Sequence, residues 1–202
     1  MAAVDDDEGR SRVLEAAEEL FYRYGTHEVR MTQVRDHAGV SLARLYKLYP
    51  SKHDLVAAYL QAHGRRVRAL LAESVEQAAP APADSRTRLL AAFDHLQETV
   101  DEPGFRGCAF VNAWAEIGGL GHERHPLVAE AVREHKTLLR DYLTGLAGDY
   151  ADARGVGEQI HILAEGVMVT SSLLGADAAR PARDSASAVL AAADSTRSAY
   201  EK

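Results

Sequence analysis

The chain of 202 residues has a formal net charge of −7, and 47% of its residues are hydrophobic. This hydrophobic content is ordinary for a globular protein with a core. The negative charge excludes a protein that coats nucleic acid over its whole surface, because such binding needs Lys and Arg to neutralise phosphates. Any DNA-binding surface must therefore be local.

The composition of the N-terminal residues and the cysteine content predict a cytoplasmic protein. Residues 1–9 are acidic rather than basic followed by apolar, so they do not resemble a signal peptide, and we expect them to be disordered. No run of about 18 apolar residues occurs, so we expect no membrane partner. The single cysteine, Cys108, excludes an internal disulfide and a cysteine-rich zinc site, which fits a reducing cytosol.

Apolar residues return every three or four positions along nearly the whole chain, which predicts an all-α fold. The first helix carries an apolar stripe from Val13 to Tyr24 and should end at Gly25, because glycine accepts a left-handed conformation. A short second helix is expected over about residues 31–38, ended by Gly39.

A third short helix should begin after Ser41, whose hydroxyl can cap the free N–H groups of the first turn. Pro50 stops this helix, and Ser51 can cap a long fourth one. Residues 78–85 form a Pro- and Ala-rich linker, since proline cannot continue a helix. Further helices are expected at about residues 85–100, 107–117, 126–146, 157–174 and 183–200.

Positive charge is concentrated where the two short helices meet. Residues 30–53 have a local balance of +4, with Asp36 as the only carboxylate. A short helix, a glycine turn and a second short helix have the layout of a helix-turn-helix, whose second helix enters the major groove of DNA. Val34 and Leu45 would hold the two helices together. On charge and spacing alone, a solvated basic patch on an ordinary helical hairpin is an equal alternative. The basic residues are Arg30, Arg35, Arg44, Lys47 and Lys52.

The order of residues favours the helix-turn-helix. It resembles the DNA-binding domain of the TetR family over about residues 10–60. The matching segments are 12–25 (RVLEAAEELFYRYG), Val34, 38–41 (AGVS), 45–46 (LY) and 49–55 (YPSKHDL). Three positions depart from the family pattern: Arg30 replaces the usual Thr or Ser cap, Arg35 replaces a small residue and Tyr49 replaces Phe. Thr32 is an alternative, displaced cap for the second helix.

The resemblance implies a set of DNA contacts on and around the third helix, which would be the recognition helix. Arg44 is the best candidate for reading a base, because a guanidinium can bond two acceptors of guanine at once. Tyr46 and Lys52 would contact phosphates. The full set is Thr32, Ser41, Leu42, Ala43, Arg44, Tyr46, Lys47 and Lys52.

The resemblance also implies the division of the chain and its function. A helix-turn-helix domain at residues 10–56 would follow the disordered residues 1–9. A helical bundle at 57–202 would bind a ligand and dimerise. The expected function is a homodimeric repressor that a small-molecule inducer releases from operator DNA, with no catalytic residues, metal or cofactor. Inducer would favour a dimer in which the fourth helix has moved the recognition helices out of groove spacing.

The helix at about 157–174 has apolar residues on more than one face, so it must be covered on two sides. Together with the Ala-rich last helix, this predicts a dimer interface. The alternative is that both faces are buried within one subunit. The predicted interface residues are Ile162, Val169, Leu173, Val189 and Ala193.

An inducer pocket is expected among the helices between the linker and residue 174, where aromatic and apolar side chains could form a wall. The alternative is that these side chains are plain core. The predicted ligand-binding residues are Phe93, Phe110, Trp114, Tyr142, His161 and Met168. Asn112 and Glu116, with His161, would add polar specificity.

Two other chemistries fit the sequence less well. His122 and His125 have the spacing of a metal-binding pair, but Gly118–Gly121 and Pro126 place them in a loop, so a solvated turn is favoured. Cys108 lacks the motifs of a catalytic nucleophile and is better explained as a buried small hydrophobe. His63 and His135 fall on apolar stripes and are expected to be hydrogen-bonded core or interdomain histidines. The alternative to a DNA-binding regulator is a helical enzyme or interaction module that shares only the helical bundle with such regulators.

Overall fold

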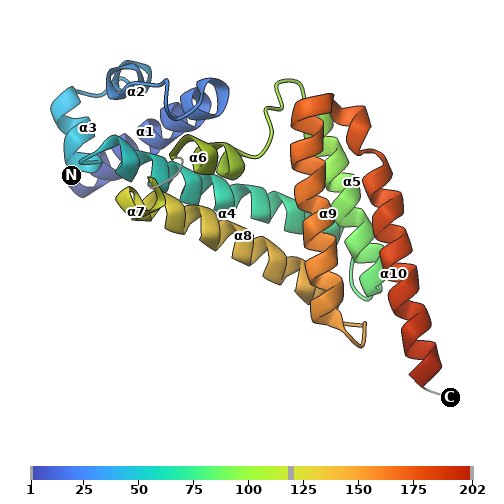
Figure 1. The fold of residues 1–202 in the computed structure, drawn as a ribbon. Coiled ribbons are helices and arrows are strands. Elements are labelled where there is room, and N and C mark those ends of the chain that lie inside the picture. The colour runs from blue at the N-terminus through green and yellow to red at the C-terminus, as the bar shows by residue number, and fades with distance from the viewer. Residues whose placement is uncertain (1, 118–120, 201–202) are drawn as a thin grey trace. The chain divides into compact units, whose positions relative to one another are not determined.

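The computed structural model describes residues 2–117 and 121–200, and this part of the chain is helical without strands, as predicted (Figure 1). Its helices are α1 (Ala2–Tyr24), α2 (Met31–Ala38), α3 (Leu42–Leu48), α4 (Lys52–Ala78), α5 (Ser85–Asp101), α6 (Ala109–Ile117), α7 (Gly121–Arg124), α8 (Pro126–Leu146), α9 (Ala153–Leu174), the 3₁₀ turn η1 (Ala176–Ala179) and α10 (Pro181–Tyr200).

Several helix boundaries differ from the sequence predictions. α1 begins at Ala2, so it includes most of the stretch 1–9 that we expected to be disordered; its acidic residues lie near the N-terminus of α1, where the helix dipole favours negative charge. α9 begins at Ala153, earlier than the expected residue 157, because the Asp152 side chain accepts a hydrogen bond from the Gly155 N–H (2.9 Å). The one-turn helix α7 lies where a loop was expected. The rest of that loop, residues 118–120, is outside the described part.

The chain forms two compact units, and the long helices α4 and α8 contribute to both. Unit 1 comprises residues 1–66 and 109–135, and unit 2 comprises 67–108 and 136–202. The expected boundary between residues 56 and 57 separates a DNA-binding domain from a ligand-binding and dimerisation domain, and it stays a prediction.

The core of unit 1 joins the first helices. Val34 of α2 and Leu45 of α3 are both fully buried, as expected of side chains between the short helices. The ring centroids of Phe21 in α1 and Tyr59 in α4 lie 5.7 Å apart. This ring pair joins α1 to the first half of α4, and α2 packs against both α1 and α3.

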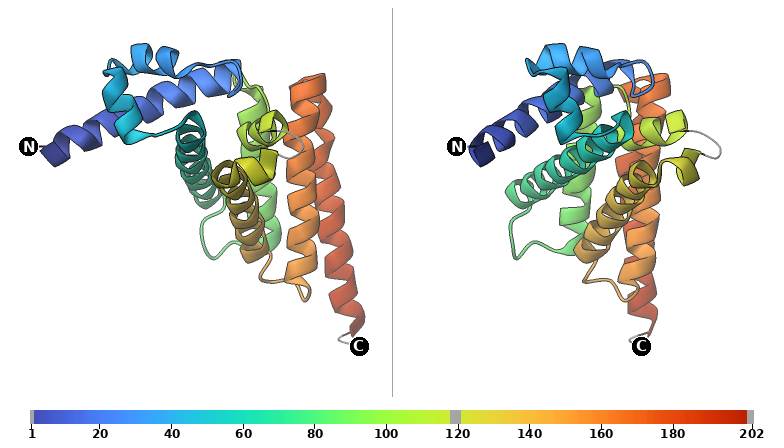
Figure 2. Two further views of the ribbon diagram at one scale, coloured as in Figure 1. Left: turned by 60° about the vertical axis from the view of Figure 1, so that its left-hand side comes forward. Right: turned by 90° about the vertical axis from the view of Figure 1, so that its left-hand side faces the viewer.

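In unit 2, α5, α9 and α10 lie side by side (Figure 2). Leu89 and Phe93 of α5, Ile160 of α9 and Leu190 of α10 are buried in one hydrophobic cluster. Within the described residues, no helix is both long enough and apolar enough to cross a membrane.

Candidate DNA-binding interface

The turn between α2 and α3 depends on Gly39 and on an arginine from α1. Gly39 has φ +63°, in the left-handed region that favours glycine. The Arg12 guanidinium donates hydrogen bonds to the carbonyl oxygens of Ala38 (2.6 and 3.0 Å) and Gly39 (2.7 Å). Because the last carbonyls of a helix lack partners within it, Arg12 stabilises this end of α2. Arg12 lies in the segment that resembles the TetR family, but the sequence pattern did not indicate this contact.

The start of α2 shows how the helix begins with Arg30 in place of the usual Thr or Ser cap. α2 begins at Met31 with Arg30 as its N-cap residue. The Gln33 side-chain oxygen accepts the Arg30 N–H at 2.7 Å, so one otherwise unpaired donor is satisfied. Thr32 lies inside the helix and is exposed, so it is not the cap.

Helix α3 has a buried side and an exposed side. Ser41 caps it as predicted, its hydroxyl accepting the Arg44 N–H at 3.1 Å. Leu45 and Leu48 are buried. The remaining side presents the exposed residues Ala43, Tyr46 and Lys47, and Leu42 is half-buried.

Arg44 is half-buried and lies against α1. A Cβ atom at Gly9 would lie 2.7 Å from its Nε and 2.9 Å from its Nη2, so the guanidinium packs closely on the helix backbone. To contact a base edge, this side chain would have to swing away from α1. The absence of a side chain at Gly9 is what allows the close approach.

Lys52 lies at the first position of α4, and its ammonium donates to the His27 carbonyl oxygen at 2.8 Å. Burial lowers the pKa of Lys52, and the nearby carboxylates of Glu116 and Glu28 oppose this shift. Lys52 therefore fixes the turn before α2, a contact that the sequence did not indicate.

Glu116, at the end of α6, binds the same turn. Its Oε2 atom accepts hydrogen bonds from the Thr26 hydroxyl (2.5 Å) and the His27 N–H (2.6 Å). Glu116 therefore supports this turn, and its part in the polar specificity of a ligand pocket stays a prediction. The 89 positions between His27 and Glu116 leave no periodic signal that could have revealed the contact.

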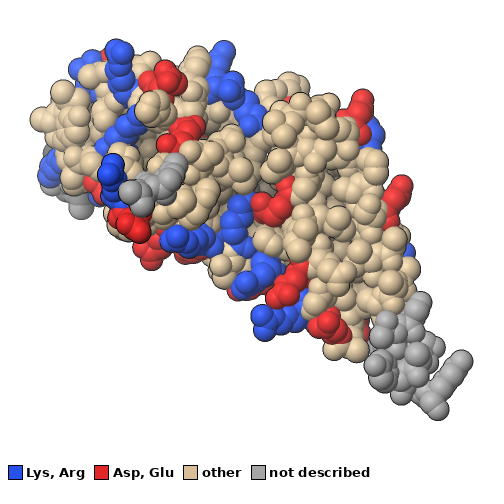
Figure 3. All heavy atoms as spheres, viewed as in Figure 1, with Lys and Arg blue, Asp and Glu red and all other residues tan. Residues whose placement is uncertain are grey.

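The local positive charge of residues 30–53 is partly neutralised. Arg35 forms an ion pair with Asp36 at 2.5 Å. The positive charge that is not neutralised by this pair comes from Arg30, Arg44, Lys47 and Lys52. Figure 3 shows Lys and Arg side chains at several places on the N-terminal helices, with acidic side chains among them.

Comparison with known proteins agrees with this geometry. Residues 13–59 match the family model "Bacterial regulatory proteins, tetR family", which covers the second half of α1, all of α2 and α3, and the start of α4. A TetR-family transcriptional regulator from Streptomyces coelicolor has 29% identity and a TM-score of 0.78, over 93% of this chain and 96% of that one. Residues 13–59 are a TetR-family domain.

Two further TetR-type relatives extend the comparison. A regulator from Streptomyces avermitilis has 25% identity and a TM-score of 0.76, over 92% of this chain and 98% of that one. The transcriptional activator FasR from Mycolicibacterium smegmatis is 38% identical over 104 residues, which are 50% of this chain. The match spans only 45% of FasR. These TetR relatives are regulators and not enzymes.

The predicted ligand-binding residues fall in both units. In unit 1, Phe110 stacks on His135 (ring centroids 3.6 Å apart), and Trp114 stacks on His122 (3.6 Å). In unit 2, Phe93 lines a cavity. Tyr142, Met168 and His161 are partly buried in the same unit. Their role in ligand binding stays a prediction.

A charged cluster in unit 2 links α8 with α9. The Lys136 ammonium contacts both carboxylate oxygens of Glu165 (2.6 and 2.7 Å) and the Cys108 thiol sulfur (3.2 Å). His161 Nε2 lies 3.4 Å from Glu165. Burial opposes ionisation of Glu165, but His161 and Lys136 outweigh it and lower its pKa to about 2. Cys108 is buried, as predicted.

The histidines singled out by the sequence have structural partners. His125 stacks on His53 (3.4 Å), whereas His122, which has metal-pair spacing to His125, stacks on Trp114. Among the described residues, no three potential metal ligands gather. His63 is hydrogen-bonded to Glu18 (3.0 Å), and His135 is buried, which confirms both as packed histidines.

The predicted dimer residues of α9 are open to solvent in the single chain. Ile162 is 69% exposed, Val169 40% and Leu173 75%. Val189 and Ala193 of α10 are instead partly buried against the core of unit 2. The alternative that both faces of α9 are covered within one subunit does not hold for these three residues.

Proposed function

We propose that this chain is a DNA-binding transcriptional regulator that acts in the cytoplasm as a homodimer. The observation that carries the proposal is α3, which is fixed by buried Leu45 and Leu48 and presents Ala43, Tyr46 and Lys47 outward. A helix anchored in this way can enter a major groove without disturbing the fold. The basic residues nearby supply phosphate contacts.

The exposed stripe on α9 supports the homodimer. Ile162, Val169 and Leu173 are large apolar side chains on one helix, and burying them removes apolar area from water. Dimerisation also serves DNA binding, because two recognition helices about 34–36 Å apart read successive major grooves.

We further propose that the regulator is a repressor released by a small molecule. Glu116 joins α6 to the turn before α2, and Lys52 joins α4 to the same turn. A ligand that shifts α6 would therefore alter the support of the helix-turn-helix. Release requires the ligand to bind the DNA-free conformation better than the operator-bound one, and the coupling must be reciprocal.

Activation is a second candidate function, favoured by the relation to FasR, which is named an activator. The two functions share the same DNA-binding surface and differ in the effect of binding on transcription. They are distinguished by the direction of change in a reporter gene.

The test begins with selection of bound sequences from a random DNA pool, followed by titration of the winning site at several salt concentrations. We expect a palindromic site, salt-sensitive binding and loss of binding in Tyr46→Ala and Lys47→Ala. Arg154→Ala, an exposed arginine of α9 in unit 2, is the matched control. A pool that yields no preferred sequence would overturn the proposal. With the selected site upstream of a reporter, lower expression supports repression and higher expression supports activation.

A further inference from the structure

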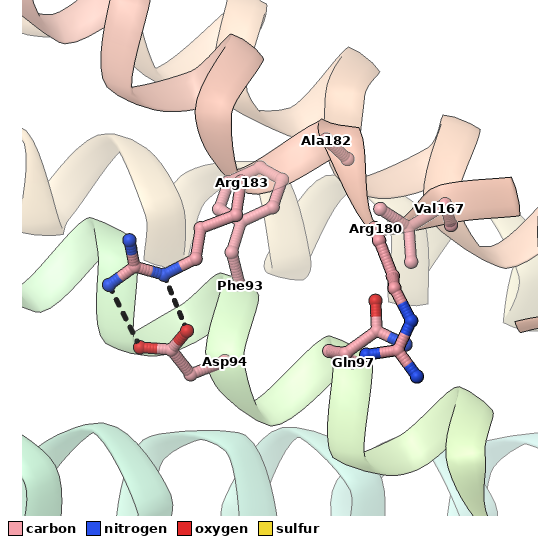
Figure 4. Close-up of a pocket in the computed structure, with 8 residues that line it drawn as sticks. Phe93, Asp94, Gln97, Val167, Arg180, Ala182 and Arg183 are labelled. Atoms are coloured by element: carbon pink, nitrogen blue, oxygen red, sulfur yellow. Dashed lines mark hydrogen bonds and ion pairs between the residues drawn. The ribbon is translucent and has the colours of Figure 1, made fainter. Parts of the chain in front are cut away.

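A cavity of about 200 Å³ lies in unit 2 between α5, α9, η1 and α10 (Figure 4). Its apolar lining consists of Phe93, Val167, Ala179 and Ala182. Phe93, Val167 and Ala179 are almost completely buried, so the inner surface belongs to the core of unit 2. The floor of the cavity is therefore apolar.

The rim of the cavity is polar and carries two guanidinium groups. Arg183 donates to Asp94 through Nε (2.5 Å) and Nη2 (3.3 Å). Arg180 donates through Nε to Asp177 (2.6 Å), while its Nη2 lies 4.0 Å from Asp101, beyond hydrogen-bond distance. Figure 4 shows the Arg183–Asp94 pair on one side and Arg180 beside Gln97 on the other.

The two guanidinium groups differ in what they can offer a ligand. Asp94 already occupies Arg183 through two bonds. Arg180 holds the Asp177 carboxylate through Nε alone. The side chains of Arg180 and Asp177 are 59% and 87% exposed. Exchange of so exposed an ion pair costs little free energy. A guanidinium matches the planar geometry of a carboxylate.

The volume limits the size of the ligand. Sites for drug-sized molecules measure about 300–1,000 Å³, so this cavity accepts a smaller molecule, about one ring in size. We propose that the cavity binds a small organic carboxylate, with its apolar ring against Phe93 and Val167 and its carboxylate on Arg180. This ligand is the effector class of the regulator, and that assignment rests on the proposed function.

Binding is tested by calorimetry on the full chain without DNA, using benzoate and cyclohexanecarboxylate as probes and benzamide as the neutral control. We expect both carboxylates to bind with one site per chain and benzamide to bind at least about tenfold more weakly, since hydrogen bonds to charged groups are the stronger ones. Equal binding of benzamide would contradict carboxylate recognition. No binding of either carboxylate at millimolar concentration would overturn the proposal.

Substitutions around the cavity test where the carboxylate binds. Arg180→Gln should weaken benzoate binding about tenfold or more, and Ala182→Phe should abolish it by filling the cavity. Asp94→Asn should strengthen binding, because it removes a negative charge beside the ligand and releases Arg183. Arg154→Gln is the control, with unchanged affinity, and circular dichroism checks that each variant is folded. Undiminished binding in folded Arg180→Gln and Ala182→Phe would place the carboxylate elsewhere and overturn the inference.

The DNA experiment separates this inference from the proposed function. Operator binding without carboxylate binding overturns the ligand site and leaves the regulator proposal standing. Carboxylate binding at Arg180 without any operator binding overturns the regulator and leaves the site standing. Benzoate that binds and changes operator affinity supports both.

Discussion

Individual side chains near α3 fall into groups with different expected effects on DNA binding. Arg44 has the donor geometry for a guanine edge but rests against Gly9 in the DNA-free chain. Tyr46 and Lys47 already point outward, on the exposed side of α3. Lys52 combines a charge with a structural hydrogen bond to His27.

Arg44→Ala should relax base preference at one operator position, at a cost of about 1–3 kcal/mol for the preferred base. The measurement is the affinity for a set of single-base operator variants. Lys52→Ala is the comparison, since loss of a phosphate contact weakens all sequences alike. If Arg44→Ala lowered affinity equally for every operator variant, its role in base reading would be rejected.

Lys52→Ala should weaken binding to all sequences and reduce the salt dependence by about one charge. The slope of log affinity against log salt concentration measures this. Lys52→Arg keeps the charge and should preserve the slope. Unfolding by urea, followed in parallel, reports the loss of the bond to the His27 carbonyl. An unchanged slope in Lys52→Ala would show that Lys52 makes no phosphate contact.

Glu165 should make stability depend on pH. Its folded-state pKa of about 2 is below the ordinary value of 4.5, so its contribution is fully present above about pH 4.5 and is lost as pH falls toward 2. After allowance for solvent screening, this contribution is about 1–2 kcal/mol. Urea unfolding of Glu165→Gln should show this deficit at about pH 7 and a smaller one at about pH 3. Glu158→Gln, on the same helix, is the control, and a deficit that did not shrink in acid would contradict the assignment.

At the scale of the helices, local sequence signals predicted most elements and failed where contacts are long-range. Ser41 and Gly39 predicted the bounds of the short helices, because capping and left-handed turns depend on nearby residues. Arg12 reaches across 26 positions to Ala38, and periodicity identifies only which face is buried, not the partner. The hydrogen bond from the Arg30 N–H to the Gln33 side chain was not predicted, because Arg is unusual as the N-cap residue of this helix.

The candidate ligand residues were the least predictable part of the site. Apolar periodicity located Phe93, Phe110 and Trp114 on helices but could not distinguish a cavity wall from a stacking partner. Phe110 and Trp114 stack on histidines, whereas Phe93 lines the cavity. Arg180 and Arg183 were not predicted, because only the fold brings them beside Asp94 and Gln97.

Glu116 should transmit changes in α6 to the helix-turn-helix. Glu116→Ala removes the acceptor of the Thr26 and His27 donors, and we expect it to reduce the change in operator affinity caused by an effector. The measurement is operator affinity with and without ligand, beside calorimetric ligand affinity. Glu116→Gln keeps one acceptor oxygen and should be intermediate. Full coupling in Glu116→Ala, with ligand binding unchanged, would exclude this route.

At the scale of the whole molecule, the apolar stripe of α9 predicts self-association. Ile162→Glu and Leu173→Glu place charges in the proposed interface, where an unpaired buried charge is costly, so both should shift the protein toward monomer. Sedimentation velocity measures this. Arg154→Glu, also on α9, is the charge-changing control. Because Ile162 and Leu173 are exposed in the single chain, neither variant should unfold the monomer; an unaltered dimer in both variants would place the interface elsewhere.

The most direct test of a dimeric DNA-binding regulator combines the two surfaces in one titration. The selected palindrome is compared with the same half-sites separated by about five additional base pairs, which rotates one half-site by about half a helical turn. We predict that two chains bind the original site and that the insertion lowers affinity to the level of a single half-site. Equal affinity for both spacings, or binding by one chain, would contradict the account.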